Sequence, residues 1–344
     1  MEIISGEKFQ RLADISIISP QTKKFQKNLR DIKLLIIPEF WVIIKPRLFY
    51  YIQQIKKSHI LFRMPFIIKR ILRFLNLNII QRFKSEKFVK VIIEDLVRIP
   101  TIIQKAKIIF VYNHLLDFFF AYIYPFLQQR FILISHNSDH SISNKYNKYL
   151  KDNKIVKWYG QNCGISHPKL IPIPIGIANT QWDHGDEKTF QKIMGKIKSK
   201  KKEEKAYANF KITTNRKHRQ KVYKIVKNNK FVVKKKIKSY YKYLEELDEF
   251  KYSIVPRGNG QDCHRLWESL YLDTIPVIDD KKLFENFTTG SWEGTPIIFI
   301  KNWKKFSEEL IIKEEKNLVI KNKWRKNLNF KYWKNLIEND LKKL

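Results

Sequence analysis

Residues 252–278 read YSIVPRGNGQDCHRLWESLYLDTIPVI, and this stretch decides the fold. It begins with an apolar run that predicts a buried strand over 252–255, and it ends with a second such run over 275–278. Between these runs lie a polar loop with two glycines and a helix predicted over 263–271. Apolar strands joined through helices indicate a parallel sheet covered on both faces. Ligands of such sheets bind beyond the carboxyl ends of the strands, so the loop at 256–262 is the predicted site.

The same alternation of apolar strands and polar helices extends to both sides of this stretch. It predicts an α/β protein built from two doubly wound, Rossmann-like domains. We expect an N-terminal domain over 1–186, a charge-dense linker over 187–207, and a C-terminal domain over 208–344 that ends in two helices. Residues 1–100 give a weak pattern apart from a strand at 34–37. Further strands are predicted at 107–112, 130–135, 155–159, 170–177, 209–214, 231–233 and 296–300, and helices at 115–127, 143–151, 216–226 and 239–247.

The chain is strongly basic, which bears on its partners. Its 344 residues include 68 Lys plus Arg and 33 Asp plus Glu, giving a formal net charge of +35. Such a charge attracts polyanions, so a basic nucleic-acid-binding protein without catalysis is the alternative function. No sequence signature of a common nucleic-acid-binding fold accompanies the charge, and therefore no specific nucleic-acid partner is expected. The basic, aromatic stretch at 41–80 either packs on the first domain or lies against an anionic membrane surface.

Cysteine usage and hydropathy bear on the compartment. The two cysteines, Cys163 and Cys263, are far apart in the sequence, which fits a reducing compartment. The first ten residues lack the apolar segment of a secretory signal. A spanning helix needs roughly 20 consecutive apolar residues, and the sequence shows no such run. We therefore expect a cytoplasmic protein, with peripheral membrane contact as the open alternative.

Gly258, Asn259 and Gly260 form the centre of the polar loop and are predicted to contact the ligand. Glycine has no Cβ, so a ligand can approach the main chain closely at 258 and 260. The helix that follows presents unpaired N–H groups and the positive end of its dipole to the loop. Phosphate groups bind at helix N-termini for these reasons. The segment therefore predicts a binding site for a phosphorylated ligand.

Charged and titratable side chains flank this loop. Arg257, His264 and Arg265 can donate charge-assisted hydrogen bonds to a diphosphate. Glu268 lies one helical turn after His264 on the same face, where its carboxylate can accept hydrogen bonds from ribose or sugar hydroxyls. The competing interpretation is a structural ion pair between Arg257 and Glu268 behind a turn, with Trp267 in the core. The convergence of glycines, cations and a carboxylate in one strand–loop–helix unit favours a binding site.

At these residues the sequence resembles a known family. The stretch at 252–278 is similar to the nucleotide-sugar motif of exostosin-like and related GT-B glycosyltransferases, with its Pro-Arg-Gly type loop, Glu-bearing helix and Ile-Pro-Val strand. The pieces SHNSD at 135–139, IPIGIAN at 173–179 and WDHGD at 182–186 resemble those of viral and microbial glycosyltransferases. The resemblance extends over residues 106–300. It implies a GT-B fold with a cleft between two domains, a UDP- or GDP-sugar as donor substrate, and a glycan, lipid or protein acceptor.

The resemblance also implies roles for two arginines after the first strand of the C-terminal domain. Arg216 and Arg219 would face the donor pyrophosphate at the mouth of the cleft, or they are surface cations of a basic chain. No Asp-x-Asp pair follows a predicted strand, so we expect neither an essential metal nor another cofactor. Cationic side chains and a helix N-terminus would instead neutralise the leaving group.

The loop after the strand at 130–135 supplies the candidate catalytic residues. An inverting transfer needs a general base within hydrogen-bond reach of the acceptor hydroxyl. His136 or Asp139 could serve if the sheet is parallel, whereas the alternative for Asp139 is to cap the next helix. His184 and Asp186, just before the predicted linker, could also face the cleft.

Overall fold

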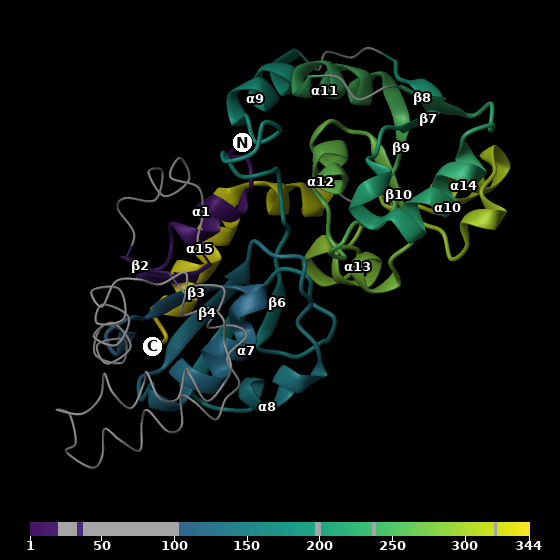
Figure 1. The fold of residues 1–344 in the computed structure, drawn as a ribbon. Coiled ribbons are helices and arrows are strands. Elements are labelled where there is room, and N and C mark those ends of the chain that lie inside the picture. The colour runs from purple at the N-terminus through teal and green to yellow at the C-terminus, as the bar shows by residue number, and fades with distance from the viewer. Residues whose placement is uncertain (20–32, 37–102, 197–200, 236–238, 320–321) are drawn as a thin grey trace, which may run out of the picture.

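The computed structural model describes residues 1–19, 33–36, 103–196, 201–235, 239–319 and 322–344. These residues form two α/β domains, each built on a sheet of parallel strands. Helices pack against both sheets, and the domains lie side by side with α12 near their junction (Figure 1). The predicted architecture of two doubly wound, Rossmann-like domains is confirmed.

The first domain contains a six-stranded sheet in the order β2-β1-β3-β4-β5-β6, counted over the described residues. Its strand β2 corresponds to the strand predicted at 34–37, whereas the preceding helix and strand gave no sequence signal. The elements are α1 (Gly6–Gln10), β1 (Ile15–Ile18), β2 (Lys33–Ile36), β3 (Ile108–Tyr112), α7 (Leu116–Phe118), β4 (Phe131–His136), α8 (Asn147–Leu150), β5 (Ile155–Gly160) and β6 (Leu170–Pro172).

The helix predicted at 115–127 is broken in the structure. It starts as α7 and continues as a π-turn over Phe119–Ile123 and a 3₁₀ turn over Tyr124–Phe126. Pro125 stands in the 3₁₀ turn, where its ring and missing N–H oppose a regular α-helical ladder. The strand predicted at 170–177 ends at Pro172, one residue before a last backbone hydrogen bond of 3.0 Å from the N–H of Ile173 to the carbonyl of Gly160.

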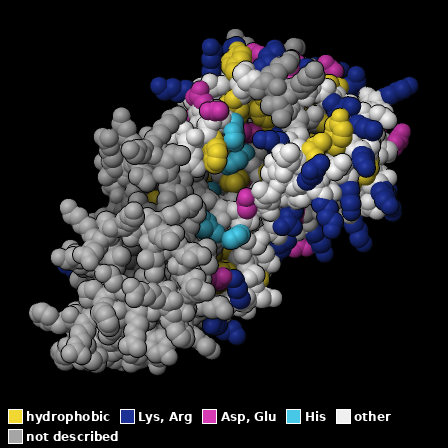
Figure 2. All heavy atoms as spheres, in the orientation of Figure 1, with side chains coloured by type: hydrophobic (Ala, Val, Ile, Leu, Met, Phe, Trp, Pro, Cys, Tyr) yellow, Lys and Arg dark blue, Asp and Glu magenta, His cyan; other side chains and the backbone are white. Residues whose placement is uncertain are grey.

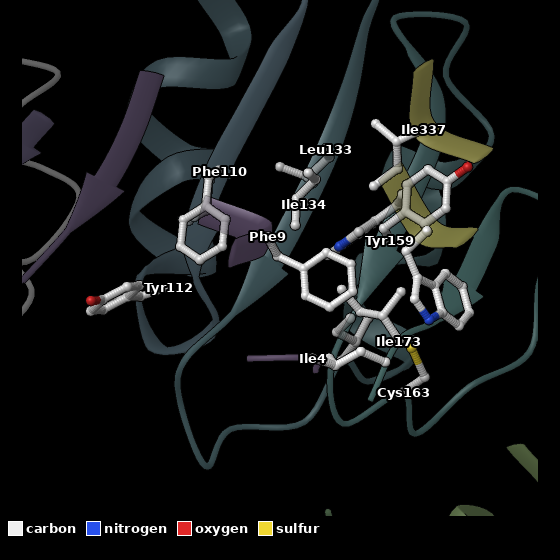
Figure 3. Packing of buried hydrophobic residues seen from close by; sticks show 14 of the residues in the cluster. Ile4, Phe9, Phe110, Tyr112, Leu133, Ile134, Tyr159, Cys163, Ile173 and Ile337 are labelled. Atoms are coloured by element: carbon white, nitrogen blue, oxygen red, sulfur yellow. The ribbon is translucent and has the colours of Figure 1, made fainter. Parts of the chain in front are cut away.

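The core of the first domain lies on its two central strands. Every residue of β3 and β4 is buried, as expected for strands covered on both faces. Figure 3 shows Phe110, Leu133 and Ile134 from these strands close to Phe9 of α1. All four side chains are fully buried, so apolar burial from α1, β3 and β4 together stabilises this domain.

The second domain contains a five-stranded sheet in the order β11-β10-β9-β7-β8, again counted over the described residues. The strand order reverses between β7 and β9, which makes this position the topological switch point of the sheet. Its strands are β7 (Glu203–Ala208), β8 (Val232–Lys234), β9 (Phe250–Ile254), β10 (Ile275–Ile278) and β11 (Ile298–Phe299), and its helices are α9 (Glu187–Lys196), α10 (Arg216–Val226), α11 (Tyr240–Glu249), α12 (His264–Tyr271), α13 (Lys281–Asn286) and α14 (Glu308–Lys316).

Strand β7 falls within the stretch that we predicted to be a linker, and the strand predicted at 209–214 is wrong. A 3₁₀ turn over Ile212–Asn215 follows β7 instead. The first half of β7 is exposed and charged, which hides the strand in the sequence. Part of that charge is paired across the sheet, since Lys251 Nζ lies 2.8 Å from a carboxylate oxygen of Glu204. The predicted linker at 187–207 therefore consists largely of α9 and β7.

The C-terminal helix α15 (Phe330–Leu341) packs on the first domain, although the predicted boundary placed it in the second. The backbone N–H of Phe330 donates to the carbonyl of Glu2 over 2.8 Å. The hydroxyl of Tyr159 in β5 donates to Asp340 Oδ2 over 2.7 Å. Figure 3 shows Ile337 of α15 beside Leu133 and Tyr159. The chain therefore crosses between the domains a second time before α15.

Among the described residues, no helix is both long and apolar enough to cross a membrane. The stretch at 41–80, for which we predicted helical pieces and weighed contact with a membrane surface, lies outside the described residues.

Candidate functional site

A cavity of about 580 Å³ lies between the two domains. The first domain contributes residues that follow β4 and β6, such as Asp139 and Ile175, and the second contributes residues that follow β7 and β9, such as Asn209 and Gly258. Figure 2 shows a hollow between the domains with histidine side chains along it. The cavity therefore occupies the switch point of the second sheet, where open α/β sheets bind ligands.

The predicted glycine loop forms one wall of this cavity. Gly258, Asn259 and Gly260 all contribute to its lining. A Cβ at residue 260 would lie 3.0 Å from Asn162 Nδ2 and 3.2 Å from the Cα of Asp139, both in the first domain. Such contacts are too close for an ordinary side chain, so Gly260 allows the two domains to approach each other at the cavity.

Arg219 holds the shape of the loop and also reaches the cavity. Its guanidinium donates to the carbonyl oxygens of Lys211, Pro256 and Arg257 over 3.0 to 3.2 Å. A guanidinium has five N–H donors, so two remain for a ligand. Burial lowers the pKa of Arg219 from its ordinary value. The predicted substrate-binding residue thus lies at the cavity, with most of its donors already committed to the main chain.

Helix α12 places His264, Arg265 and Glu268 in the lining of the cavity. The buried Nε of Arg265 has no hydrogen-bond partner among the described residues. Its guanidinium carbon lies 5.7 Å from the centroid of the Tyr243 ring. His264 Nδ1 is 2.8 Å from the carbonyl oxygen of Gly176 in the first domain, and burial lowers the pKa of its imidazole. The lining of the cavity therefore combines the guanidinium-bearing Arg265 with an imidazole whose pKa is lowered by burial.

Glu268 is buried beside two tyrosines of α11. Tyr243 donates its hydroxyl hydrogen to Glu268 Oε2 over 2.8 Å, and Tyr240 donates to Oε1 over 3.2 Å. Burial raises the pKa of the Glu268 carboxyl from its usual value. Each carboxylate oxygen can accept more than one hydrogen bond, so Glu268 keeps acceptor capacity for a ligand hydroxyl.

Two predicted arginines lie away from the cavity lining. Arg257 is half-exposed, and its Nη1 lies 3.7 Å from Asp280 Oδ2. The competing interpretation of an ion pair between Arg257 and Glu268 does not describe the structure, because each residue has other partners. Arg216 is exposed at the first residue of α10. The structure thus assembles the predicted cluster from α12 and the glycine loop, without these two arginines.

The two candidate bases are placed very differently. Asp139 is exposed and contributes to the cavity lining. The turn that follows it begins at Asn144 with Ser143 as N-cap, so Asp139 does not cap that turn. His136 is fully buried outside the lining, where its Nε2 lies 3.1 Å from the carbonyl of Pro174. Burial lowers the pKa of His136 to about 4. The structure therefore brings Asp139, and not His136, to the cavity.

His184 and Asp186, the two residues just before the predicted linker that could face the cleft, have different surroundings in the structure. His184 contributes to the cavity lining, and its ring centroid lies 6.1 Å from that of His264. Burial, together with neighbouring His264, lowers the pKa of His184. Asp186 instead lies outside the lining and accepts hydrogen bonds from Thr189 at the start of α9.

Sequence reasoning missed much of the lining that comes from the second domain. Had β7 been placed at 203–208, the rule that ligands bind beyond strand ends would have marked Asn209 and Lys211. The tyrosines of α11 gave no such signal, because their spacing suits a helix face packed on the core. Lining residues that were not named individually among the predicted site residues are Ile175, Asp183, Asn209, Lys211, Thr214, Ser239, Tyr240, Tyr243, Asp262 and Cys263.

The charges around the cavity suit a ligand with both phosphate and hydroxyl groups. Lys211, Arg219 and Arg265 supply positive charge on the side of the second domain. Asp139, Asp183 and Glu268 supply carboxylate acceptors. No group of three or more His, Cys, Asp or Glu side chains suited to a metal ion occurs in the part of the chain that the structure describes.

Comparison with known proteins supports a glycosyltransferase in coarse terms. Residues 179–344 match the family model described as the RXYLT1 C-terminal domain. The chain is also 25% identical over 111 residues to ribitol-5-phosphate xylosyltransferase 1 of Homo sapiens. That alignment covers 29% of this chain and 25% of the human protein, so the chain spans about a quarter of the length of this relative.

Two solved structures cover nearly the whole chain at low similarity. The glycotransferase of kitacinnamycin aligns with a TM-score of 0.37 and 10% identity, over 95% of this chain and 98% of its own. UDP-GlcNAc 2-epimerase from Methanocaldococcus jannaschii aligns with a TM-score of 0.38 and 12% identity, over 96% of this chain and 99% of its own. Both TM-scores are low, so these likenesses are distant.

Proposed function

We propose that this chain transfers a sugar from a nucleotide-sugar donor to a hydroxyl group of a glycan acceptor, without a divalent metal. The observation that carries the proposal is the cavity at the switch point, where the cations Lys211, Arg219 and Arg265 and the buried carboxylate of Glu268 converge. The match of residues 179–344 supports it, because that range includes the entire second domain. The exostosin-like subtype of the GT-B class remains part of the proposal.

The donor diphosphate would lie between the N-terminus of α12 and the cations of the cavity. Cys263, the N-cap residue of α12, makes no side-chain cap hydrogen bond, so the first turn of the helix is open to an anion. Arg265, which also lines the cavity, can donate charge-assisted hydrogen bonds from its guanidinium to the same group. Glu268 would accept a hydrogen bond from a donor hydroxyl, as a buried acceptor gives such a contact specificity. The donor would be a UDP- or GDP-sugar.

The reaction would be a single displacement at the anomeric carbon. An acceptor hydroxyl oxygen forms a bond to that carbon while the bond from the carbon to the diphosphate oxygen breaks. The electron pair leaves with the nucleoside diphosphate, whose growing negative charge Arg265 and Lys211 would stabilise. The hydroxyl proton passes to Asp139, which lies at the cavity on the acceptor side.

The name of the human relative joins xylose transfer with ribitol-5-phosphate. We propose that the present chain shares the general chemistry, with a polyhydroxylated acceptor. Xylose nucleotides therefore belong among the donors to be screened.

A thermal-shift screen of UDP- and GDP-sugars, with and without a chelator, tests the proposal. A ligand that binds only the native state at 100 times its dissociation constant adds about 2.7 kcal/mol of stability. We expect at least one nucleotide sugar to raise the melting temperature equally with and without EDTA. The donor assignment would be wrong if none did, and the metal-free part would be wrong if stabilisation returned only with manganese.

A further inference from the structure

Trp182 is an exposed tryptophan beside the cavity. Its side chain is 55% exposed, whereas the other tryptophans in the described part of the chain are buried. An exposed indole presents a large, flat apolar surface together with one polar N–H group, which suits contact with a partly apolar ligand. The next two residues, Asp183 and His184, contribute to the cavity lining. Trp182 therefore lies at the rim of the proposed active site.

The turn that carries Trp182 is built by specific contacts. The backbone N–H of Trp182 donates to the carbonyl of Asn179 over 3.0 Å, and the N–H of Gly185 donates to the carbonyl of Trp182 over 2.9 Å. A Cβ at residue 185 would lie only 2.0 Å from the carbonyl oxygen of Asn179, so glycine is required there. These contacts fix the backbone that carries Trp182 at the rim of the cavity.

Asn179 anchors this turn to the first domain. Its Oδ1 accepts a hydrogen bond of 2.8 Å from the backbone N–H of Glu7, and its Nδ2 donates to Asn137 Oδ1 over 3.0 Å. Asn137 belongs to the loop after β4 that also carries Asp139. The indole and the proposed base are therefore fixed to the same structural unit, which is the acceptor side of the cavity.

A second aromatic side chain, His184, lies between the indole of Trp182 and the interior of the cavity. The rings of Trp182 and His184 stack with centroids 6.2 Å apart and planes inclined by 24°. His184 in turn meets Tyr240 edge-on at 6.5 Å. Figure 2 shows hydrophobic atoms next to histidine atoms in the hollow between the domains. The flat apolar surface of Trp182 at the rim is therefore next to the polar side chains of His184 and Tyr240 inside the cavity.

We propose that Trp182 forms an acceptor subsite, where a sugar ring of the acceptor glycan stacks on the indole and places a hydroxyl group toward the cavity. A pyranose ring has an apolar face of C–H groups and a polar edge of hydroxyls. The indole would stack on the apolar face of the sugar ring, and Asp183 and His184 would form hydrogen bonds with the hydroxyl groups at its edge. This inference rests on the proposed function, since it names the acceptor side of the same site.

The test compares the wild-type protein with Trp182→Ala and Trp182→Phe on an array of immobilised glycans. We expect the wild type to bind a subset of the glycans, and Trp182→Ala to bind them roughly tenfold more weakly, which corresponds to about 1.4 kcal/mol. Trp182→Phe should retain part of the affinity because it keeps an aromatic face. Tyr223→Ala, which removes an exposed aromatic of α10 outside the lining, is the matched control and should bind as the wild type does.

Donor affinity, measured by calorimetry with UDP and GDP, separates this inference from the proposed function. Equal donor affinity in the wild type and Trp182→Ala, with weaker glycan binding in the variant, supports the acceptor subsite. Equal glycan binding by Trp182→Ala, or no glycan binding by the wild type, would overturn it. A loss confined to UDP or GDP affinity would also overturn it, because a nucleobase would then occupy the indole. Failure of UDP and GDP to bind any of these proteins would contradict the proposed function instead.

Discussion

Asp262, at the end of the glycine loop, accepts a hydrogen bond of 2.7 Å from the backbone N–H of Ile175 in the first domain. Its other carboxylate oxygen accepts from Trp267 Nε1 over 2.7 Å, and its own N–H donates to Asn162 Oδ1 over 2.8 Å. One buried residue of the second domain is thus bonded to two loops of the first. This relationship fixes the distance between the donor and acceptor sides of the cavity.

Replacement of Asp262 by Asn should change how stability depends on pH. Burial raises the pKa of the Asp262 carboxyl from its ordinary value of 3.8 to about 7. The folded state then binds more protons than the unfolded state between these values, so this contribution to stability is complete below about pH 4 and is lost as pH rises to about 7. Each unit of such a shift corresponds to about 1.4 kcal/mol.

Urea unfolding from pH 4 to pH 8 provides the measurement for Asp262→Asn. The wild type should lose stability relative to the variant up to about pH 7, and the difference should be constant above that value. Asp273→Asn is the control, because the Asp273 side chain is 46% exposed. If the stability of the wild type and of Asp262→Asn changed in parallel over this pH range, the raised pKa of the Asp262 carboxyl would be contradicted.

Gly260→Ala should disturb the contact between the domains. Its added methyl group would lie 3.0 Å from Asn162 Nδ2 and 3.2 Å from the Cα of Asp139. We expect destabilisation of about 1–3 kcal/mol, as for other overpacked sites, together with weaker donor binding. Gly195→Ala in α9 is the matched control, since its Cβ would meet nothing within 4 Å and alanine favours a helix. Equal melting temperatures and donor affinities in the two variants would show that the close approach at Gly260 is unimportant.

Glu268→Gln should weaken donor binding while leaving most of the local packing intact. Glutamine keeps one acceptor oxygen for the tyrosine hydroxyls of α11 but loses the charge and the second acceptor. Loss of one charged hydrogen bond costs about 1.5–3 kcal/mol, or roughly 10- to 100-fold in affinity. Calorimetry with the donor found in the screen measures this change. If Glu268→Gln had a lower melting temperature but normal donor affinity, Glu268 would stabilise the fold and would not bind the donor.

Arg265→Met should reduce donor affinity far more than Arg257→Met. Arg265 lines the cavity, whereas Arg257 lies outside the lining and is half-exposed beside Asp280. We expect roughly a 10- to 100-fold loss for Arg265→Met, and less than about fivefold for Arg257→Met. The opposite order would restore the sequence-based hypothesis that Arg257 faces the diphosphate.

The sequence predicted most of the second domain because its central strands are short, apolar and bounded by clear loops. β9 and β10 lie within a residue or two of their predicted positions. β7 was missed because only its last three residues are buried. Its first three residues are exposed and charged, and such a pattern cannot be distinguished from a solvated linker without knowledge of the neighbouring strands.

For the site, sequence reasoning succeeded where residues adjoin in the chain and failed where the fold joins distant ones. The glycine loop and α12 form one continuous stretch, so Gly258, Gly260 and Glu268 could be named together. Which loops of the first domain face that stretch depends on how the two sheets pack, and no local pattern encodes this. His136 and Asp139 are three residues apart, and only the course of the backbone after β4 decides which of them reaches the cavity.

The return of α15 to the first domain has a consequence for the order of folding during synthesis. Trp333 and Ile337 of this helix are buried in the same core as Phe9 of α1. Domains generally fold as units, beginning with the N-terminal one as the chain emerges from the ribosome. Here the first core cannot close until residues 330–341 have been made, after the whole second domain. Ribosome-bound nascent chains that stop before Phe330 should therefore leave an apolar face of the first sheet open to chaperones.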